Sequence, residues 1–249
     1  MRLVRRLAVG LVAVACVAIV VGYQANRPAK AISDPRVFIP APGVYTHLPP
    51  SLRATIADVY WLFAIQYYGE HVKSDQRLDS LPATVDLVTR LSPRFREPYF
   101  FGAFSSIDSG DPARGYQLLE RGFRENPGDW RFPFYLGFFA YTFASNADKD
   151  TIAAQWYAKA ASLPGSPLYL QRLAAELAQK GNDTQKAIDL WTQVYAQGDK
   201  YAREKAVAAL DKLLPRDKVA RQKAVAGLKD LVPSSEFDQF VADLFQAYL

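Results

Sequence analysis

Apolar residues recur along most of the chain at the spacing of one helical face, and short polar or proline-containing segments separate these stretches. The first strong stretch of the body covers residues 52–69, and Ser51 before it is a candidate N-cap. Three prolines, Pro93, Pro127 and Pro164, each end a later helical stretch, because proline cannot continue a helix. This pattern predicts an all-α fold.

Two series of positions repeat with the period of a helix pair. The three prolines are 34 and 37 residues apart. Small or apolar residues of the intervening helices are 34, 38 and 34 residues apart, at Leu81, Gly115, Ala153 and Ala187. A period in this range is typical of two-helix repeats, in which stacking buries a core that no single pair could bury alone.

The residues around these positions resemble the tetratricopeptide repeat family, whose pattern is W-x2-L-G-x2-Y, then A-x3-F, then P. Copies of the first block begin at Ile65, Tyr99, Pro133 and Leu170, and they place Gly69, Ala103, Gly137 and Ala174 at the small position. Copies of the second block read Leu81-x3-Val85, Gly115-x3-Leu119, Ala153-x3-Tyr157 and Ala187-x3-Trp191. The resemblance covers approximately residues 52–200 and implies a helical-hairpin solenoid.

The repeats are degenerate. The first-position Trp is absent from every copy, no Tyr occupies its usual place, and the third repeat carries about four extra residues around positions 146–150. The small residues have a physical reason, because only a small side chain lets the two helices of a pair approach closely. A relative of the family and another kind of helical-pair solenoid both fit this pattern.

Three further amphipathic stretches follow the repeats, at about 200–214, 216–231 and 234–248, and they meet at Pro215 and Pro233. In the first of them, Ala and Leu form one helical stripe while Lys and Arg lie elsewhere. We therefore predict a C-terminal helical cap that closes the solenoid with a polar outer face.

Residues 7–23 carry no charge over 17 positions and follow three arginines. A helix of this length spans roughly 25 Å, enough for a thin bilayer, and predicts an uncleaved signal-anchor with one transmembrane helix. A cleaved signal is the alternative, because Ala-Lys-Ala at 29–31 has the form of a cleavage site. Positive charge at the amino end places the N-terminus in the cytoplasm and the body on the periplasmic or cell-surface side.

Cys16 lies inside this apolar run, where lipidation is one interpretation and a small hydrophobe buried in lipid is the simpler one. Six of the 16 prolines lie between positions 28 and 50, which predicts an extended, semi-rigid segment. The expected organisation is a transmembrane anchor at 1–26, a Pro-rich linker or strap at 27–50, helical repeats at 51–200 and the helical cap at 201–249.

The chain has 249 residues and a formal net charge of +5, to which the three N-terminal arginines contribute three. From position 7 onward, 27 basic residues stand against 25 acidic ones, so the body lacks the dense basic face of a nucleic-acid-binding protein. Residues 200–230 are locally basic, with nine Lys or Arg against four Asp or Glu. A solvated helical face and a contact with anionic lipid headgroups both fit this segment.

The composition offers little for catalysis. One Cys and two His exclude a disulfide framework and a Cys-rich zinc site. The sequence lacks the motifs of phosphate-binding loops, metalloproteases and haem attachment. His47 and His71 have no metal-ligand motif near them, while Glu97, Asp108 and Asp111 are typical of helix caps and turns. We therefore expect no enzyme activity, no cofactor and no metal site.

Aromatic residues are concentrated between positions 95 and 143, which hold 15 of the chain's 33. On the helix predicted near 133–144, the positions that pack inside the repeat are small or apolar, which turns three other aromatic residues onto a different face. Two aromatic residues map to the same face one repeat earlier. In the tetratricopeptide family this face lines the concave groove that binds peptides or partner helices. The candidate partner-binding residues are Phe100, Phe104, Arg131, Phe134, Phe138 and Tyr141.

These observations predict a membrane-anchored scaffold or adaptor that binds a protein partner through an aromatic groove and assists the assembly of a membrane or envelope complex. Three alternatives stay open. The aromatic rings could be core or lie under the Pro-rich strap. The body could be an enzyme or a small-ligand binder with a pocket between repeats. The basic C-terminal helices could bind a membrane surface peripherally.

Overall fold

The computed structural model describes residues 45, 48–145 and 147–246 of the chain. These described residues form eleven α-helices and one 3-10 helix, with no strand among them, which confirms the all-α fold. The helices are α3 (Pro50–His71), α4 (Leu81–Leu91), α5 (Glu97–Asp108), α6 (Pro112–Glu125), α7 (Arg131–Phe143), α8 (Lys149–Ala161), α9 (Tyr169–Lys180), α10 (Thr184–Gln197), α11 (Lys200–Leu213), α12 (Lys218–Ala226), η1 (Lys229–Leu231) and α13 (Phe237–Gln246).

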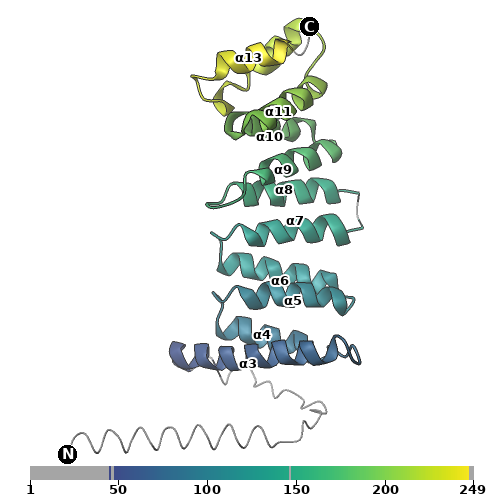
Figure 1. The fold of residues 1–249 in the computed structure, drawn as a ribbon, viewed down its shortest axis with the longest axis vertical. Coiled ribbons are helices and arrows are strands. Elements are labelled where there is room, and N and C mark those ends of the chain that lie inside the picture. Colours follow the sequence, from purple (N-terminus) through teal and green to yellow (C-terminus); the bar gives the residue numbers. More distant parts are fainter. Residues whose placement is uncertain (1–44, 46–47, 146, 247–249) are drawn as a thin grey trace, which may run out of the picture. The chain divides into compact units, whose positions relative to one another are not determined.

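From α3 to α11, each helix packs against the next one in the chain, and the hairpins succeed one another in order (Figure 1). We call α3, α5, α7, α9 and α11 the odd helices and α4, α6, α8 and α10 the even helices. Each hairpin consists of an odd helix, a turn and the following even helix. This is a helical-repeat arrangement, compatible with a tetratricopeptide-like solenoid.

Aspartate side chains fix the start of four helices. In each case a carboxylate oxygen accepts a hydrogen bond from the backbone N–H three residues later, a donor that the helix itself leaves open. The N–H groups of Arg114, Lys186, Ala202 and Ala220 donate to Asp111, Asp183, Asp199 and Asp217 over 3.1, 3.2, 2.9 and 2.8 Å. The expected capping role of Asp111 is confirmed, and such a cap contributes about 1 kcal/mol.

The predicted helix ends agree with the structure, but one predicted start is wrong. Pro93, Pro127 and Pro164 follow α4, α6 and α8 within three residues. Helix α3, however, begins at Pro50, so Ser51 lies inside the helix instead of capping it. Proline is favoured at the first helical position because its missing N–H would have no partner there.

Small residues allow close helix packing at most of the predicted places. A Cβ atom on Gly115 would lie 2.7 Å from the carbonyl oxygen of Ala103, and one on Gly137 would lie 3.1 Å from the ring of Tyr157. Side chains at these positions would push the helices apart. Gly69 differs, since a Cβ atom there would meet nothing within 4 Å. The first copy of the repeat therefore lacks the close contact that its glycine predicted.

The buried core runs through the stack in two main clusters. One cluster joins α5 to α7 and includes Tyr99, Phe132 and Leu136, whose side chains are fully buried. The other extends from α7 to α13 and ends on Phe240 and Leu244. The C-terminal helices therefore complete the same core as the repeats, as expected of a cap.

Arg221 in α12 contradicts the expectation of a solvated basic face over residues 200–230. Its side chain has no exposed surface. Its Nη2 atom donates to Oδ1 of Asp211 over 2.8 Å and to the carbonyl oxygen of Leu244 over 3.2 Å. The guanidinium thus joins α11, α12 and α13, since a buried charge is stable only when it is paired and hydrogen-bonded.

The expected anchor and its cleaved or lipidated alternatives lie outside the described residues, as does most of the Pro-rich segment. Among the helices that the structure describes, none is both long and apolar enough to cross a bilayer.

A candidate partner-binding surface

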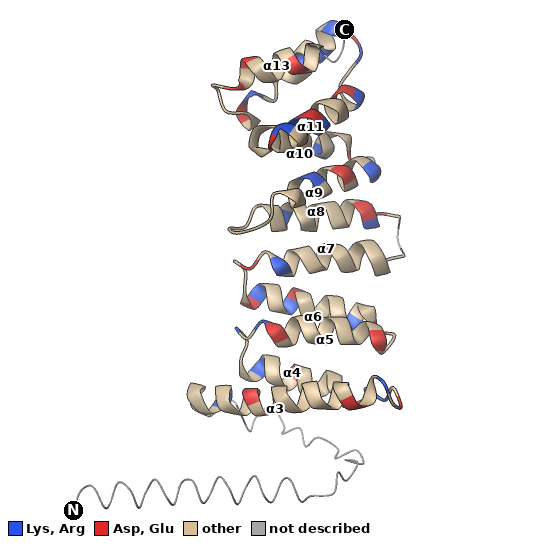
Figure 2. Cartoon of the chain, in the orientation of Figure 1, with Lys and Arg blue, Asp and Glu red and all other residues tan. Residues whose placement is uncertain are grey.

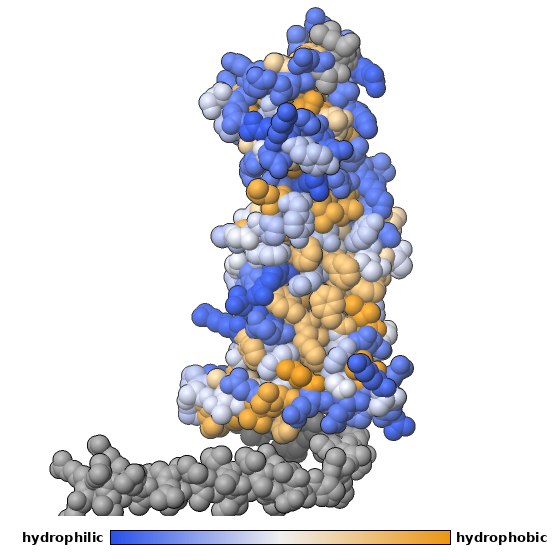
Figure 3. Space-filling view, in the orientation of Figure 1, coloured by the Kyte–Doolittle hydropathy of each residue, from blue (hydrophilic) through white to orange (hydrophobic). Residues whose placement is uncertain are grey.

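The six predicted partner-binding residues lie on α5 and α7, at the surface of the stack. Phe104 is 36% exposed and Tyr141 is 40% exposed, while the other four are half-buried. We define the aromatic face as Phe100 and Phe104 of α5 with Phe134, Tyr135, Phe138 and Tyr141 of α7. Figure 3 shows hydrophobic side chains gathered at the level of α5 to α8, whereas the level of α10 to α13 is mainly hydrophilic. The aromatic face is therefore neither fully buried core nor fully solvated.

Helix α7 is apolar on two sides, which explains how it serves both the core and the surface. Phe132, Leu136 and Phe139 point into the core and are at most 2% exposed. Arg131 is the one charged side chain of the helix, at its first position (Figure 2). A helix that is apolar nearly all round is normally covered by protein or lipid, and the part of the chain that the structure describes leaves the aromatic face partly exposed.

Ring contacts tie the aromatic face together across two hairpins. The ring of Phe104 lies 5.1 Å from that of Tyr135 and 6.2 Å from that of Phe138, centroid to centroid. Phe134 instead contacts Tyr157 of α8, with centroids 5.7 Å apart. Such pairs contribute about 0.5–1.5 kcal/mol each beyond the burial of their area. The half-buried rings thus stabilise the fold as well as forming a surface.

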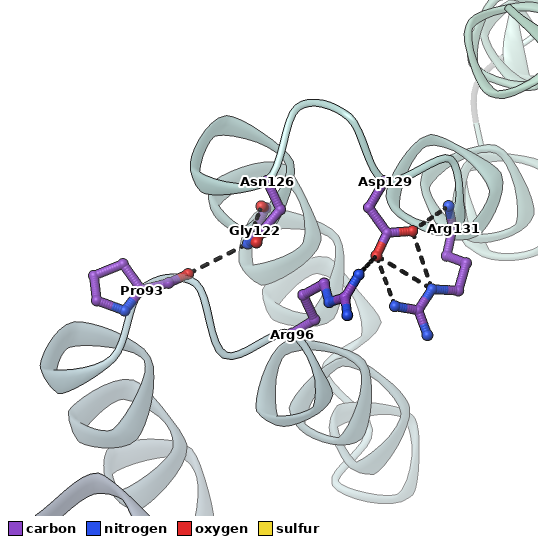
Figure 4. Close-up of polar contacts among 6 residues, drawn as sticks. All are labelled: Pro93, Arg96, Gly122, Asn126, Asp129 and Arg131. Atoms are coloured by element: carbon purple, nitrogen blue, oxygen red, sulfur yellow. Dashed lines mark hydrogen bonds and ion pairs between the residues drawn. The ribbon is translucent and has the colours of Figure 1, made fainter. Parts of the chain in front are cut away.

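Arg131 lies beside this face, but its charge is already balanced. Its Nε and Nη2 atoms donate to Oδ1 and Oδ2 of Asp129 over 3.0 and 2.7 Å, and Arg96 adds a further bond at 3.2 Å (Figure 4). Burial opposes ionisation of Asp129, yet the hydrogen bonds from Arg131 hold the pKa of that carboxyl below its ordinary value. The Arg131 guanidinium also covers the ring of Phe100 at 5.0 Å. The guanidinium therefore packs on this ring while it pairs with Asp129.

Two lysines that the sequence analysis missed flank Tyr141. The Nζ atom of Lys180 lies 4.9 Å from the centre of its ring and 3.4 Å from its hydroxyl, and Nζ of Lys149 lies 5.7 Å from the ring centre. Lys180 also pairs with Asp150 at 3.2 Å. Lys180 follows Tyr141 by 39 residues, about one repeat, so the repeat period was the signal that could have found this contact.

The most exposed large apolar side chains lie mainly on the odd helices. Among the residues described, the even helices carry none of them, and Val219 of α12 is the exception outside the odd series. The others are Leu52, Val59, Leu62, Phe63 and Ile65 on α3, Phe104 on α5, Tyr141 on α7, Leu168 and Tyr169 at the start of α9, and Tyr201 on α11. Exposed large apolar side chains thus occur on all five odd helices, beyond the two helices singled out from the sequence.

A cavity of about 720 Å³ lies elsewhere, between α4, α5 and α6. It is lined by none of the six predicted residues. Arginines of α6 and aspartates of α4 and the neighbouring turns give it a polar wall, while Leu81, Val85 and Leu118 give it an apolar one. The groove predicted over the aromatic residues is therefore not this cavity.

The histidine and aspartate side chains near the first repeat make local structural contacts. The Nδ1 atom of His71 lies 2.7 Å from Oδ1 of Asp75, one helical turn later, and Asp108 accepts a hydrogen bond from the hydroxyl of Tyr68 over 2.7 Å. Within the described ranges, no three side chains of His, Cys, Asp or Glu come together as a metal site would require. His47 lies outside the described residues.

A comparison of the chain with protein-family models finds no match, and neither does a comparison with curated proteins. The function is therefore argued from the surface itself.

Proposed function

We propose that this protein is a membrane-anchored scaffold, a divergent relative of the tetratricopeptide family, that binds a protein partner through the odd-helix side with the aromatic face at its centre. The observation that carries the proposal is the gathering of exposed large apolar side chains on α3, α5, α7, α9 and α11. Exposed apolar surface costs free energy in water, and a patch of it commonly marks an interaction site.

The chemistry of the aromatic face suits a helix or an extended peptide. Phe104 and Tyr141 present exposed rings, and the ring of Phe104 contacts that of Phe138. Aromatic and Arg side chains dominate the binding energy of protein interfaces. Full burial of each such ring contributes roughly 1.5–3 kcal/mol before the cost of association is subtracted. We therefore propose a partner of modest affinity, held by apolar contacts with cations at the edge.

The membrane part of the proposal rests on the sequence. The uncharged run at 7–23, preceded by three arginines, supports a signal-anchor with the N-terminus in the cytoplasm and the helical body outside it. A scaffold tethered in this way meets its partners in or beside the membrane. We propose that it assists the assembly of a membrane or envelope complex.

Site-specific photo-crosslinking in intact cells tests the partner-binding surface. A photoreactive amino acid replaces Phe104 in the full-length protein, and Val219, which is 73% exposed but lies on α12, is the matched control position. We expect a discrete crosslinked species of one mass from position 104 and none from position 219.

A second measurement separates loss of binding from loss of fold. The double variant Phe104→Ala, Tyr141→Ala removes the two most exposed rings of the aromatic face and is expected to abolish co-purification of the crosslinked partner with nearly unchanged helical melting. Crosslinking of equal strength from both positions, or an unchanged partner in the double variant, would contradict the proposal.

A further inference from the structure

The cavity of about 720 Å³ is a groove with α4 on one side, α6 on the other and α5 as its floor. We call it the α4–α6 groove. Its size lies in the range of ligand-binding pockets, roughly 300–1,000 Å³. It belongs to different helices and different side chains from the aromatic face, so its role is independent of the function proposed above.

A glycine forms the floor of the groove. A Cβ atom on Gly102 of α5 would lie 2.6 Å from Val85 of α4 and 2.6 Å from Leu118 of α6. The two even helices therefore send apolar side chains over α5 at this point. Together with Leu81, which also lines the groove, Val85 and Leu118 form its apolar middle.

Positive charge lies along the α6 wall. Arg114 and Arg124 line the groove and are exposed, and neither side chain makes an ion pair or a hydrogen bond in the part of the chain that the structure describes. They lie ten residues apart on one helix, which separates them by about 15 Å along the helix axis. The apolar Leu118 lies between them.

A third arginine is already held in place. Arg121 donates to Oδ1 of Asp86 and to the hydroxyl of Thr89, both over 2.5 Å, and its guanidinium lies 5.8 Å from the ring centre of Tyr99. Its Nε atom is buried without a hydrogen-bond partner.

Three aspartates also line the groove. Asp86 pairs with Arg121 and with Arg90, and Asp111 caps α6 by accepting the backbone N–H of Arg114. Burial opposes ionisation of Asp86, but the hydrogen bonds from the two arginines hold the pKa of its carboxyl below the ordinary value. Asp79 is the third, and within the described residues neither Asp79 nor Asp111 pairs with a basic side chain.

We propose that the α4–α6 groove binds an extended acidic peptide segment of a partner protein, with two carboxylates four residues apart and an apolar residue midway between them. An extended chain rises about 3.3 Å per residue, and residues i, i+2 and i+4 share one face. Four residues therefore span about 13 Å, close to the helical rise of about 15 Å between Arg114 and Arg124. The central apolar side chain then lies over the half-buried Leu118.

Fluorescence anisotropy with a synthetic peptide tests the proposal on the full-length protein in detergent. The probe carries Glu-Ser-Leu-Ser-Glu between flexible Gly-Ser ends, and a second peptide carries Lys in place of both Glu residues. We expect the acidic peptide to bind at physiological salt and the basic one to bind at least tenfold more weakly. Charge-assisted hydrogen bonds of about 1.5–3 kcal/mol correspond to this factor.

Charge reversal identifies the site. Arg114→Glu and Arg124→Glu are each expected to weaken binding of the acidic peptide tenfold or more. Arg94→Glu is the matched control, because Arg94 is exposed and lies outside the groove. The double variant Phe104→Ala, Tyr141→Ala should bind the peptide as the wild type does, which separates this site from the aromatic face.

Three results would overturn the proposal. The two peptides bind equally, or Arg94→Glu weakens binding as much as the groove variants do. Alternatively, free citrate displaces the peptide and replacement of the central Leu by Gly changes nothing, in which case the groove recognises small anions and not a peptide.

Discussion

The hydroxyl of Tyr195 in α10 donates a hydrogen bond of 2.6 Å to Oδ2 of Asp243 in α13. The ring of Tyr195 is 1% exposed and packs on Phe240, with centroids 4.8 Å apart. Burial, followed by this hydrogen bond, raises the pKa of Tyr195 above its ordinary value of 10.0. The contact joins residues 48 positions apart and holds the last helix on the repeats.

Tyr195→Phe removes this hydrogen bond and keeps the ring. We expect the free energy of unfolding to fall by about 1–2 kcal/mol, because the lost bond is to a charged group. Tyr201→Phe is the control, since Tyr201 is 57% exposed. Denaturant melts measure both variants. An effect of Tyr201→Phe as large as that of Tyr195→Phe would contradict this role of the tyrosine.

Alanine at two glycines should have opposite effects. Gly115→Ala is expected to destabilise the fold by about 1–3 kcal/mol, because its methyl group would lie 2.7 Å from the backbone oxygen of Ala103. Gly69→Ala meets open space within α3 and should stabilise by roughly 0.5–1 kcal/mol through helix propensity. Thermal melts followed by circular dichroism give both values. If both variants shift the melting temperature by the same amount in the same direction, the difference in packing between the two glycines is contradicted.

The helical repeats were predictable because their signals are local. Pro93 and Pro127 mark helix ends through backbone chemistry, and Asp111 caps a helix within three residues of its own position. The position of Phe104 and Tyr141 on the surface of their helices also follows from helical periodicity. Periodicity does not predict which residues contact a given side chain, because those contacts come from the neighbouring hairpin.

Arg221 illustrates this limit. Its contact partners are residues 10 and 23 positions away, Asp211 of α11 and Leu244 of α13. The contact of Lys180 with Tyr141 and the free arginines of the α4–α6 groove are equally non-local. A single sequence shows which residues lie on one helix face, but it does not show how adjacent hairpins are aligned.

Arg221→Leu should be the most destabilising of the charge changes in the cap. It leaves the Leu244 carbonyl and Asp211 without their partner, and breaking a buried pair in this way costs about 3 kcal/mol. Lys223→Leu changes the same charge at an exposed position two residues away and should be nearly neutral. Urea unfolding compares the two. A small effect at position 221 would mean that the guanidinium is replaceable by apolar packing.

The ionised carboxyl of Asp129 should make the free energy of unfolding fall in acid. The pKa of its carboxyl is lower in the folded protein than the ordinary 3.8, so the unfolded chain binds a proton first as the pH falls. Its contribution is complete above pH 3.8 and is lost as the pH falls through the folded-state pKa. Asp129→Asn should therefore lower stability at neutral pH, and its difference from the wild type should shrink in acid.

Melting curves between neutral pH and about pH 2.5 measure this difference. Asp58→Asn is the matched control, because Asp58 is exposed on α3. A difference between Asp129→Asn and the wild type that stays constant over the whole range would contradict the assignment.

Within the repeats, several polar contacts join one hairpin to the next. Asn126 donates to the carbonyl oxygen of Pro93 over a separation of 33 residues (Figure 4), Arg121 reaches Asp86 over 35, and Trp156 reaches Tyr116 over 40. Coupling of this nearest-neighbour kind lets terminal units fray while the interior stays folded. Amide hydrogen exchange should therefore be fastest at the ends of the stack and slowest near α7 and α8. Under a force applied to one end, the hairpins should unfold one after another, beginning at that end.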